Sequence, residues 1–302
     1  MSETSKVTSI KNKMKREEVY QRLKAEKARE KREMRKQRKK EEEQDPSLLE
    51  ERLKNNVPKT LENTREFDET VVEEADEEVA EDEATDEFAQ YFNGAAPKIL
   101  ITTSKNVSAG CYDFAAELVD IFPNAQFVKR GTRFEVKQIV EFCKNRDFTD
   151  IIIINEDRKV PNGLTLIHLP EGPTAYFKLT SIKLSKDIDN HGRTSAHTPE
   201  LILNNLNTRL GHTVGRMFQS LFPHVPEFQG RQVCTFHNQR DFLFFRRHRY
   251  VFRDTKRVDL QELGPRFTLK LQWLRRGAFD DQAPYEWLRK PELETSRRRF
   301  FL

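Results

Sequence analysis

Three short landmarks occur twice, in the same order, along the apolar part of this chain. Gly172-Pro173 and Gly264-Pro265 each open an apolar segment, at an offset of 92 residues. Asp150 before the apolar run 151–154 resembles Asp241 before 242–245, and the Phe-Pro pairs 122–123 and 222–223 follow helical patterns. A repeated order at nearly constant spacing is typical of a repeated structural unit. The sequence therefore predicts one domain with two related half-units, about 98–184 and 190–277.

The two half-units differ in charge. Asn155, Glu156 and Asp157 follow the apolar run of the first copy, whereas Arg246, Arg247, His248 and Arg249 follow that of the second. A basic strand end is a candidate surface for an anion. We therefore expect a shared scaffold in which anion binding belongs to the second half.

Charge also divides the chain into segments. Residues 1–44 carry 16 Lys/Arg against 9 Asp/Glu, residues 62–88 carry 1 against 14, and residues 89–302 carry 33 against 23. Low apolar content and high charge are typical of segments without a packed core. The predicted organisation is a basic helical or disordered arm (1–60), an acidic disordered linker (61–95), a folded domain (96–290) and a basic tail (291–302).

The arm and the linker each allow more than one interpretation. Residues 11–43 predict a helix that is polar all round, and the basic run 31–40 is either a nuclear-import signal, a phosphate-binding arm or a solvated helix face. The acidic stretch either shields the basic arm until RNA displaces it or aids solubility.

The composition excludes several classes of protein. No apolar run approaches the roughly 20 residues of a membrane span, and no charged-then-apolar leader is present. Cys111, Cys143 and Cys234 lie far apart inside apolar patterns, without zinc-like or disulfide-like spacing. We expect a soluble protein that is not secreted, with reduced core cysteines.

Hydrophobic periodicity predicts α/β structure in both halves. The first half has the order strand, helix, strand, helix, strand, with an apolar strand at 151–154 covered on both faces. In the second half, Thr198-Pro199-Glu200 predicts a helix start, and too few residues remain for a crossover helix before a hairpin of 232–237 and 242–245. Alternation predicts that Phe267, Leu269, Leu271 and Trp273 are core residues.

Catalytic signatures are missing from the sequence. It has no dinucleotide-binding or phosphate-binding glycine loop and no nucleophile elbow. His191, His197 and His212 suit loop hydrogen bonding better than a metal site. We predict no catalytic residue, no metal and no cofactor.

Arginine and aromatic residues alternate in the second half, which favours RNA, because guanidinium groups pair with phosphate and stack on unpaired bases. The competing interpretation is a core of aromatics beneath a solvated basic face. The predicted RNA-binding residues are Arg246, Arg247, Arg249, Arg253, Lys256, Arg257, Arg266, Lys270, Arg275, Arg276, Arg297, Arg298 and Arg299.

The segment 264–277, Gly-Pro-Arg-Phe-Thr-Leu-Lys-Leu-Gln-Trp-Leu-Arg-Arg-Gly, resembles the signature ending of Brix-domain ribosome-assembly factors. The resemblance continues through Asn190-His191-Gly192-Arg193, Arg209-Leu210-Gly211-His212 and the stretch 233–242, and it covers about residues 97–290.

This resemblance implies a two-lobed α/β Brix domain, each lobe similar to a class IIa tRNA synthetase anticodon-binding domain. It also implies a non-catalytic nucleolar factor that binds pre-ribosomal RNA and assembly proteins during maturation of the large (60S) subunit. A family member serving the small-subunit precursor, a pure protein-interaction scaffold and a synthetase-like enzyme are the alternatives.

Overall fold

The computed structural model describes residues 12–60, 62–72, 76–92, 94–254 and 257–302. The chain divides into two compact units, Met1–Thr64 and Arg65–Leu302.

The described part of the first unit is helical. It contains α2 (Lys13–Gln44), α3 (Pro46–Asn55) and the 3-10 turn η1 (Glu62–Thr64). The side chain of Asn12 accepts hydrogen bonds from the backbone of Met14 and Lys15, which caps α2. α2 has no buried residue, so the helix predicted to be polar all round is confirmed. No helix of the described residues is long and apolar enough to cross a membrane.

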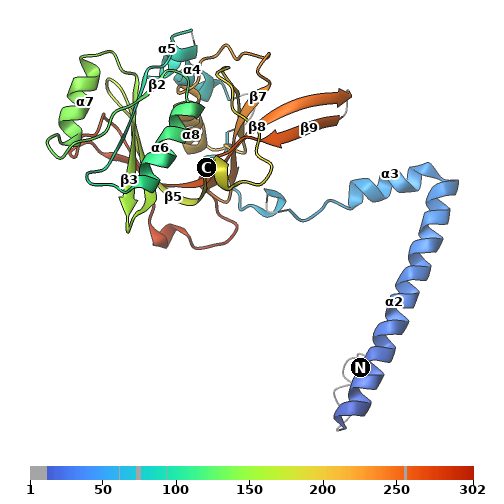
Figure 1. Cartoon of the computed structure of the whole chain (residues 1–302). Helices are drawn as coiled ribbons and strands as arrows, with labels where there is room; N and C mark the ends of the chain where they lie inside the picture. Colours follow the sequence, from blue (N-terminus) through green and yellow to red (C-terminus); the bar gives the residue numbers. More distant parts are fainter. Residues whose placement is uncertain (1–11, 61, 73–75, 93, 255–256) are drawn as a thin grey trace. The chain divides into compact units, whose positions relative to one another are not determined.

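The second unit is a mixed α/β domain (Figure 1). Its helices are α4 (Glu77–Thr85), α5 (Ala89–Phe92), α6 (Ala109–Ile121), α7 (Val136–Lys144) and α8 (Arg209–Gln219), with short 3-10 turns η2 (Ser185–Asp187) and η3 (Pro291–Leu293). Its strands are β1 (Ile99–Thr103), β2 (Ala125–Phe127), β3 (Asp150–Asp157), β4 (Val160–His168), β5 (Thr174–Lys183), β6 (Glu200–Asn204), β7 (Gln232–Gln239), β8 (Phe242–Asp254), β9 (Arg257–Glu262), β10 (Arg266–Arg275) and β11 (Tyr285–Leu288).

One sheet joins both halves, in the order β2-β1-β3-β4-β5-β10-β8-β7-β6, with β9 paired to β8 and β11 to β10. β1 runs parallel to β2 and β3, and β6 runs parallel to β7. All the other pairings are antiparallel. The strand, helix, strand, helix, strand order of the first half and the hairpin of the second half are therefore confirmed.

The duplication is visible in this topology. The series β1, α6, β3, β4, β5 of the first half corresponds to β6, α8, β7, β8, β10 of the second. Gly172-Pro173 precedes β5 and Gly264-Pro265 precedes β10, and these two strands pair antiparallel at the centre of the sheet. Lys178 lies opposite Lys270 there, and these residues are themselves 92 positions apart, so the pseudo-twofold axis passes between them.

The Phe-Pro landmarks also occupy equivalent places, one after α6 and one after α8. The rings of Phe122 and Phe222 contact each other at a centroid distance of 5.3 Å. The equivalent residues thus meet where the two halves are joined.

The third landmark does not mark equivalent strands. Asp150 begins β3, whereas Asp241 precedes β8. In the topology, however, β3 of the first half corresponds to β7 of the second, and β4 corresponds to β8. A buried strand of either kind carries an apolar run, so the short match did not distinguish them. Consequently Arg246 to Arg249 lie in the middle of the 13-residue β8 and not at a strand end. The contrast in charge survives, because β4 contains no Lys or Arg.

The prediction that a helix starts at Thr198-Pro199-Glu200 is wrong. Residues 200–204 form β6, and the helix begins at Arg209, where the hydroxyl of Thr208 accepts a hydrogen bond from the backbone N–H of Gly211 at 2.9 Å. Proline opens strands as well as helices, and the pairing of β6 with β7 decided between them.

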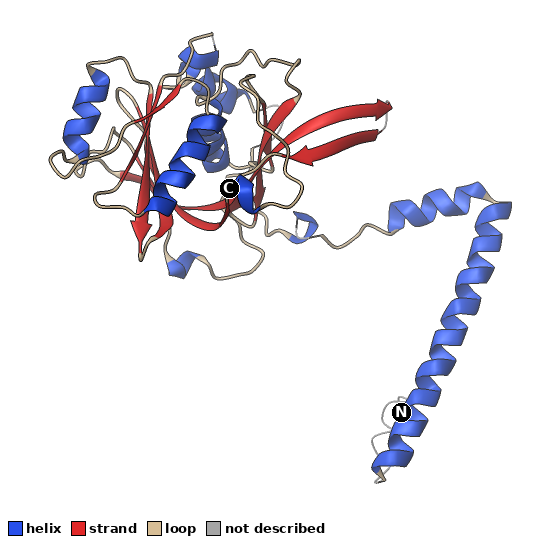
Figure 2. Cartoon of the chain, viewed as in Figure 1, coloured by secondary structure: helices blue, strands red, loops and turns tan. Residues whose placement is uncertain are grey.

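The two faces of the sheet are covered differently. The main core lies on the inner face, where α6 and α8 pack against alternate residues of the strands (Figure 2). On the outer face, α7 covers the first half over Leu100, Ile151 and Ile153, which confirms that the strand at 151–154 is covered on both sides. Between α8 and β7 the structure describes no helix, so the second half has no counterpart of α7.

The acidic segment, expected to be a disordered linker, packs against the domain over residues 76–92. Three carboxylates contact basic side chains of α8: Glu78 contacts Arg209 at 3.0 Å, Glu83 contacts His212 at 2.7 Å, and Asp86 contacts Arg216. Phe88 and Tyr91 are buried beside His168, with ring distances of 4.7 and 5.3 Å. Composition alone predicts disorder for this segment. It does not show that basic residues of α8 lie where they can bind the segment.

The end of the chain is also built into the domain. Leu302 is 1% exposed and belongs to the main core. Asp241 accepts hydrogen bonds from the backbone N–H groups of Phe301 and Leu302 at 2.7 and 2.9 Å. An ideal Cβ on Gly211 would lie 3.1 Å from the carbonyl carbon of Leu302, so the glycine at this position of α8 permits close packing of the tail.

Candidate nucleic-acid interface

The outer face of the sheet between β5 and β8 presents aromatic and cationic side chains. Successive residues of a strand point to opposite faces, and Leu243, Phe245 and Arg247 of β8 are buried on the inner face. The alternate residues and their cross-strand neighbours therefore share the outer face. We call this set the open face: Tyr176, Lys178, Phe242, Phe244, Arg246, His248, Arg266, Lys270 and Trp273.

Three basic groups crowd together at the centre of the open face. Burial lowers the pKa of Arg246, and the neighbouring charge of Arg266 lowers it further. Burial likewise lowers the pKa of His248, against the opposing effect of Glu262, and Arg246 and Arg266 add to the lowering. Glu262 accepts two hydrogen bonds from Arg266, each 2.6 Å long. An anion bound here would offset the repulsion between the guanidinium groups of Arg246 and Arg266.

The aromatic residues of the open face lie beside its cations. The Nζ of Lys270 is 4.7 Å from the ring centroid of Phe242 and 3.1 Å from the carboxylate of Glu294. Hydrogen bonds from Arg289 and Lys270 lower the pKa of Glu294 to about 2. The carboxylate of Glu294 therefore occupies a position beside Lys270 that would also suit a phosphate oxygen.

Trp273 was predicted to be a core residue, which is wrong. A register shift between Leu271 and Trp273 turns the indole to the outer face, where it stacks on Tyr176 at a ring distance of 5.7 Å. Leu274 is buried instead. The bulge that causes this exchange had no separate signal in the alternating pattern.

β8 and β9 extend together beyond the rest of the sheet as a two-stranded ribbon (Figure 1). Two of the predicted RNA-binding residues lie on it, Arg253 and Arg257, and Arg253 forms an ion pair with Asp259. Arg249 lies where β8 still pairs with β7, opposite Gln232. Lys256 lies outside the described residues. Phe252 and Leu260 are 65% and 61% exposed, so the ribbon also carries apolar surface.

Arg247 does not belong to the interface. It is 1% exposed, its guanidinium donates a hydrogen bond to the Gln232 side chain at 2.7 Å, and burial lowers its pKa. The alternation of β8 puts it on the opposite face from Arg246. The prediction that Arg247 binds RNA is therefore wrong.

The remaining predicted residues are dispersed. Arg275 stacks on Tyr285 at 4.0 Å and on Trp273 at 5.4 Å, whereas Arg276 is exposed beside the acidic segment. Arg297, Arg298 and Arg299 are exposed on the tail, and Arg299 lies over the ring of Phe301 at 5.6 Å. The structure thus unites Arg246, Arg266 and Lys270 and separates the others from them.

Sequence reasoning missed Tyr176, Lys178 and His248 as members of this surface. The signal that could have found them is the period-two alternation along β5 and β8, which combines aromatic and basic residues on one face. Their assignment to the same face as Arg246 needed the strand pairing.

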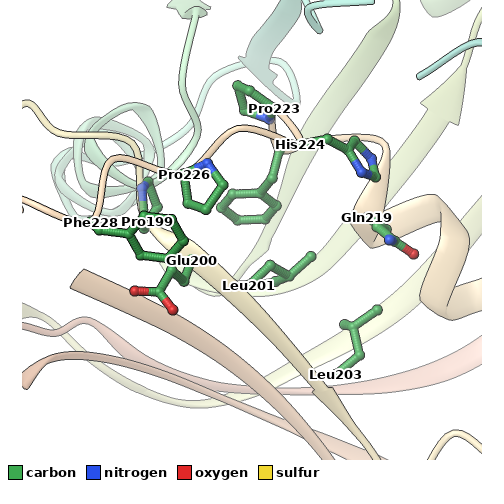
Figure 3. Close-up of a pocket in the computed structure, with 10 residues that line it drawn as sticks. Pro199, Glu200, Leu201, Leu203, Gln219, Pro223, His224, Pro226 and Phe228 are labelled. Carbon is green, nitrogen blue, oxygen red and sulfur yellow. The ribbon is translucent and has the colours of Figure 1, made fainter. Parts of the chain in front are cut away.

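A groove of about 490 Å³ lies between β6 and the loop after α8 (Figure 3). Its described lining is mostly proline, leucine and phenylalanine, and it includes no serine, cysteine or lysine. Glu200, at its rim, accepts a hydrogen bond from the hydroxyl of Tyr250. Within the described ranges, no group of three His, Cys, Asp or Glu residues could hold a metal ion.

The three cysteines are free and buried. Burial raises the pKa of Cys111 and Cys234 to about 12 and that of Cys143 to about 11. Thiols held in this state are poor nucleophiles, and the prediction of core cysteines is confirmed.

Comparison with known proteins identifies the family. Residues 104–273 match the Brix domain, and the chain belongs to the Brix-domain family. It is 52% identical over 297 residues to ribosome production factor 1 of Saccharomyces cerevisiae, covering 97% of this chain and 98% of that protein. It is 57% identical over 251 residues to ribosome production factor 1 of Xenopus laevis, covering 82% and 73%.

A solved structure described as a probable ribosomal biogenesis protein from Aeropyrum pernix K1 covers 58% of this chain and 96% of its own. Its sequence identity is 16% and its TM-score is 0.44.

Proposed function

We propose that this protein is a non-catalytic ribosome biogenesis factor that binds precursor ribosomal RNA through the open face during maturation of the large (60S) subunit. The observation that carries the RNA part is the combination of aromatic and cationic residues on a sheet face whose second half has no described counterpart of α7. The names of its full-length relatives support the part in ribosome production.

The chemistry of the open face suits unpaired nucleotides. Phosphate oxygens pair with guanidinium and ammonium groups, and bases stack on aromatic rings and on arginine. Arg246, Arg266 and Lys270 supply the cations, and Tyr176, Phe244 and Trp273 supply rings that are partly exposed. A scaffold that bound only protein would not need cations and aromatic rings combined on one sheet face.

Nuclear and nucleolar location and association with other assembly proteins follow from the same proposal, since the precursor is made and processed there. The basic run 31–40 on α2 supplies an import signal or an additional phosphate-binding arm in this scheme. The likeness of each lobe to a synthetase anticodon-binding domain stays a prediction.

Titration of the full-length chain against precursor RNA fragments at several salt concentrations tests the interface. Replacing Arg246 and Lys178 with alanine removes two cations, and we expect weaker binding with a log–log salt slope shallower by roughly 0.7 to 0.9 per lost phosphate contact. Lys137→Ala with Lys144→Ala, on the outside of α7, removes the same charge elsewhere and is the matched control. Equal losses in both double variants would contradict a localised interface.

Crosslinking the protein in cells and sequencing the attached RNA tests the assignment to the large subunit. Reads from the large-subunit precursor are expected. Reads concentrated in the small-subunit precursor or a small nucleolar RNA would favour the sister role within the family, and the absence of enriched RNA would favour the protein scaffold.

A further inference from the structure

The first half of the domain carries an apolar groove of about 520 Å³ beside the helix that covers its outer face. It lies between α7 and the strands β1 and β2, and its floor includes Leu100, Ile139 and Cys143. The apolar residues of its walls stay partly open to solvent: Phe134 is 46% exposed, Phe142 40% and Val128 52%. Contiguous exposed apolar surface of this kind marks interaction sites on soluble proteins.

The walls of the groove are held in place. The rings of Phe134 and Phe142 meet edge to face at a centroid distance of 5.5 Å. Lys98 Nζ lies 4.5 Å from the ring centroid of Phe148 and donates a hydrogen bond to the backbone carbonyl of Arg146 at 2.7 Å. The groove is therefore preformed, which lowers the entropic cost of binding.

Cations surround the groove, and most of them contact rings and carbonyl groups. Arg146 donates to the backbone carbonyl of Phe142 at 3.0 Å, and Lys129 lies 5.1 Å over the ring of Tyr112. Among the described residues, the carboxylate seen to pair at this rim is Glu135, which contacts Lys105 and Arg130. The rim formed by Lys98, Lys129 and Arg146 therefore presents positive charge that complements an acidic ligand.

The floor of the groove favours an apolar side chain over a nucleotide base. A buried base needs partners for its polar edges, and leaving them unpaired is costly. The hydroxyl of Thr102 already donates to the carbonyl of Val128 at 2.8 Å, and the neighbouring floor is aliphatic. A leucine or phenylalanine side chain would fill this space without unmet polar groups.

We propose that this groove docks an acidic amphipathic segment of a partner protein, with a leucine or aromatic side chain between α7 and β2 and carboxylates against Lys98, Lys129 and Arg146. The groove lies in the first half, whereas most of the open face lies in the second. The chain can therefore hold a protein partner and RNA at the same time.

The test begins with selection of random twelve-residue peptides displayed on phage against the full-length protein. We expect the selected sequences to combine Asp or Glu with Leu, Phe or Met. Fluorescence anisotropy of the synthesised peptides then measures affinity for the wild type, for Phe134→Ser with Phe142→Ser, and for Lys129→Glu with Arg146→Glu. Each double variant should weaken binding by about tenfold or more, and the effect of charge reversal should shrink at high salt.

The matched control is Val225→Ser with Phe228→Ser, two residues that are 79% and 66% exposed in the second half. This variant should stay within twofold of the wild type, and thermal unfolding should show that all variants are folded. Peptides without an acidic and apolar signature, or peptides insensitive to both groove variants, would overturn the proposal. So would loss of oligouridine binding or of self-association in the phenylalanine variant, because the occupant would then be RNA or a second copy.

Discussion

Arg246 and Arg247 are adjacent in the chain and differ in what surrounds them. Arg246 lies on the open face beside Arg266, whereas Arg247 is enclosed and bonded to Gln232. Because Arg247 is buried and its guanidinium donates to the neutral side chain of Gln232, its aliphatic stem and this hydrogen bond are important for stability.

Arg247→Ala should therefore destabilise the domain by about 2–4 kcal/mol, because it leaves a cavity and an unpaired Gln232 side chain. Arg246→Ala should change stability by less than about 1 kcal/mol and should instead weaken RNA binding. Denaturant unfolding and RNA titration of both variants check this. A larger loss of stability for Arg246→Ala than for Arg247→Ala would reverse the assignment of faces.

His248 makes the open face sensitive to pH. Its pKa is lowered from 6.5 in the folded domain, by burial first and also by Arg246 and Arg266, although Glu262 opposes the shift. The unfolded chain therefore binds the proton more readily, so this contribution to stability is complete above about pH 6.5 and is lost as the pH falls towards the folded pKa. His248→Gln should remove this part of the pH dependence, as measured by thermal unfolding between pH 5 and 8.

RNA should act on His248 in the opposite direction. A phosphate beside the imidazole favours its charged form, so binding takes up a proton and affinity should rise as the pH falls from 7.5 to 6. The difference in RNA affinity between the wild type and His248→Gln across this interval measures the effect. A constant ratio of the two affinities would place the phosphate away from His248.

At the scale of elements, ion pairs connect α4 and its C-cap residue Asp86 to α8. The side chain of Arg216 is 13% exposed and that of Asp86 20%, so these pairs are better shielded than ordinary surface ion pairs. Phe88, two residues after Asp86, is buried and adds an apolar contact.

Replacing Glu83 with Gln and Asp86 with Asn should weaken this contact by about 1–2 kcal/mol, since each removes a charge-assisted hydrogen bond. Hydrogen exchange across residues 76–92 should then be faster, and in the wild type it should be faster at high salt. Glu81→Gln with Asp82→Asn changes exposed acids on the same helix and is the control. Unchanged exchange in the first variant would show that Phe88 and Tyr91 hold the segment alone.

For the whole domain, the last residues close the main core. Thr208 donates to the backbone carbonyl of Phe301 at 2.7 Å, and Asn238 donates to that of Leu302 at 3.1 Å. The tail thus joins the cap of α8 to the turn between β7 and β8.

Deleting residues 300–302 should destabilise the domain by about 2–4 kcal/mol, because it empties a core position, removes both backbone donors to Asp241 and takes one acceptor from Asn238. Replacing Arg297, Arg298 and Arg299 with alanine should leave unfolding nearly unchanged, because all three are exposed. Denaturant unfolding of the two variants compares these effects. Similar midpoints would mean that the tail docks without contributing to the fold.

The amino-acid sequence by itself determined the duplicated α/β domain, the equivalence of the two Gly-Pro strands and the missing crossover helix of the second half. These features depend on local periodicity and spacing, which survive in a linear pattern. Only the tertiary structure decided which face each arginine of β8 occupies, where the bulge turns Trp273, and that carboxylates of the acidic segment pair with α8. Those outcomes depend on strand register and on contacts between residues more than 100 positions apart, such as Glu83 and His212, and a linear pattern carries neither.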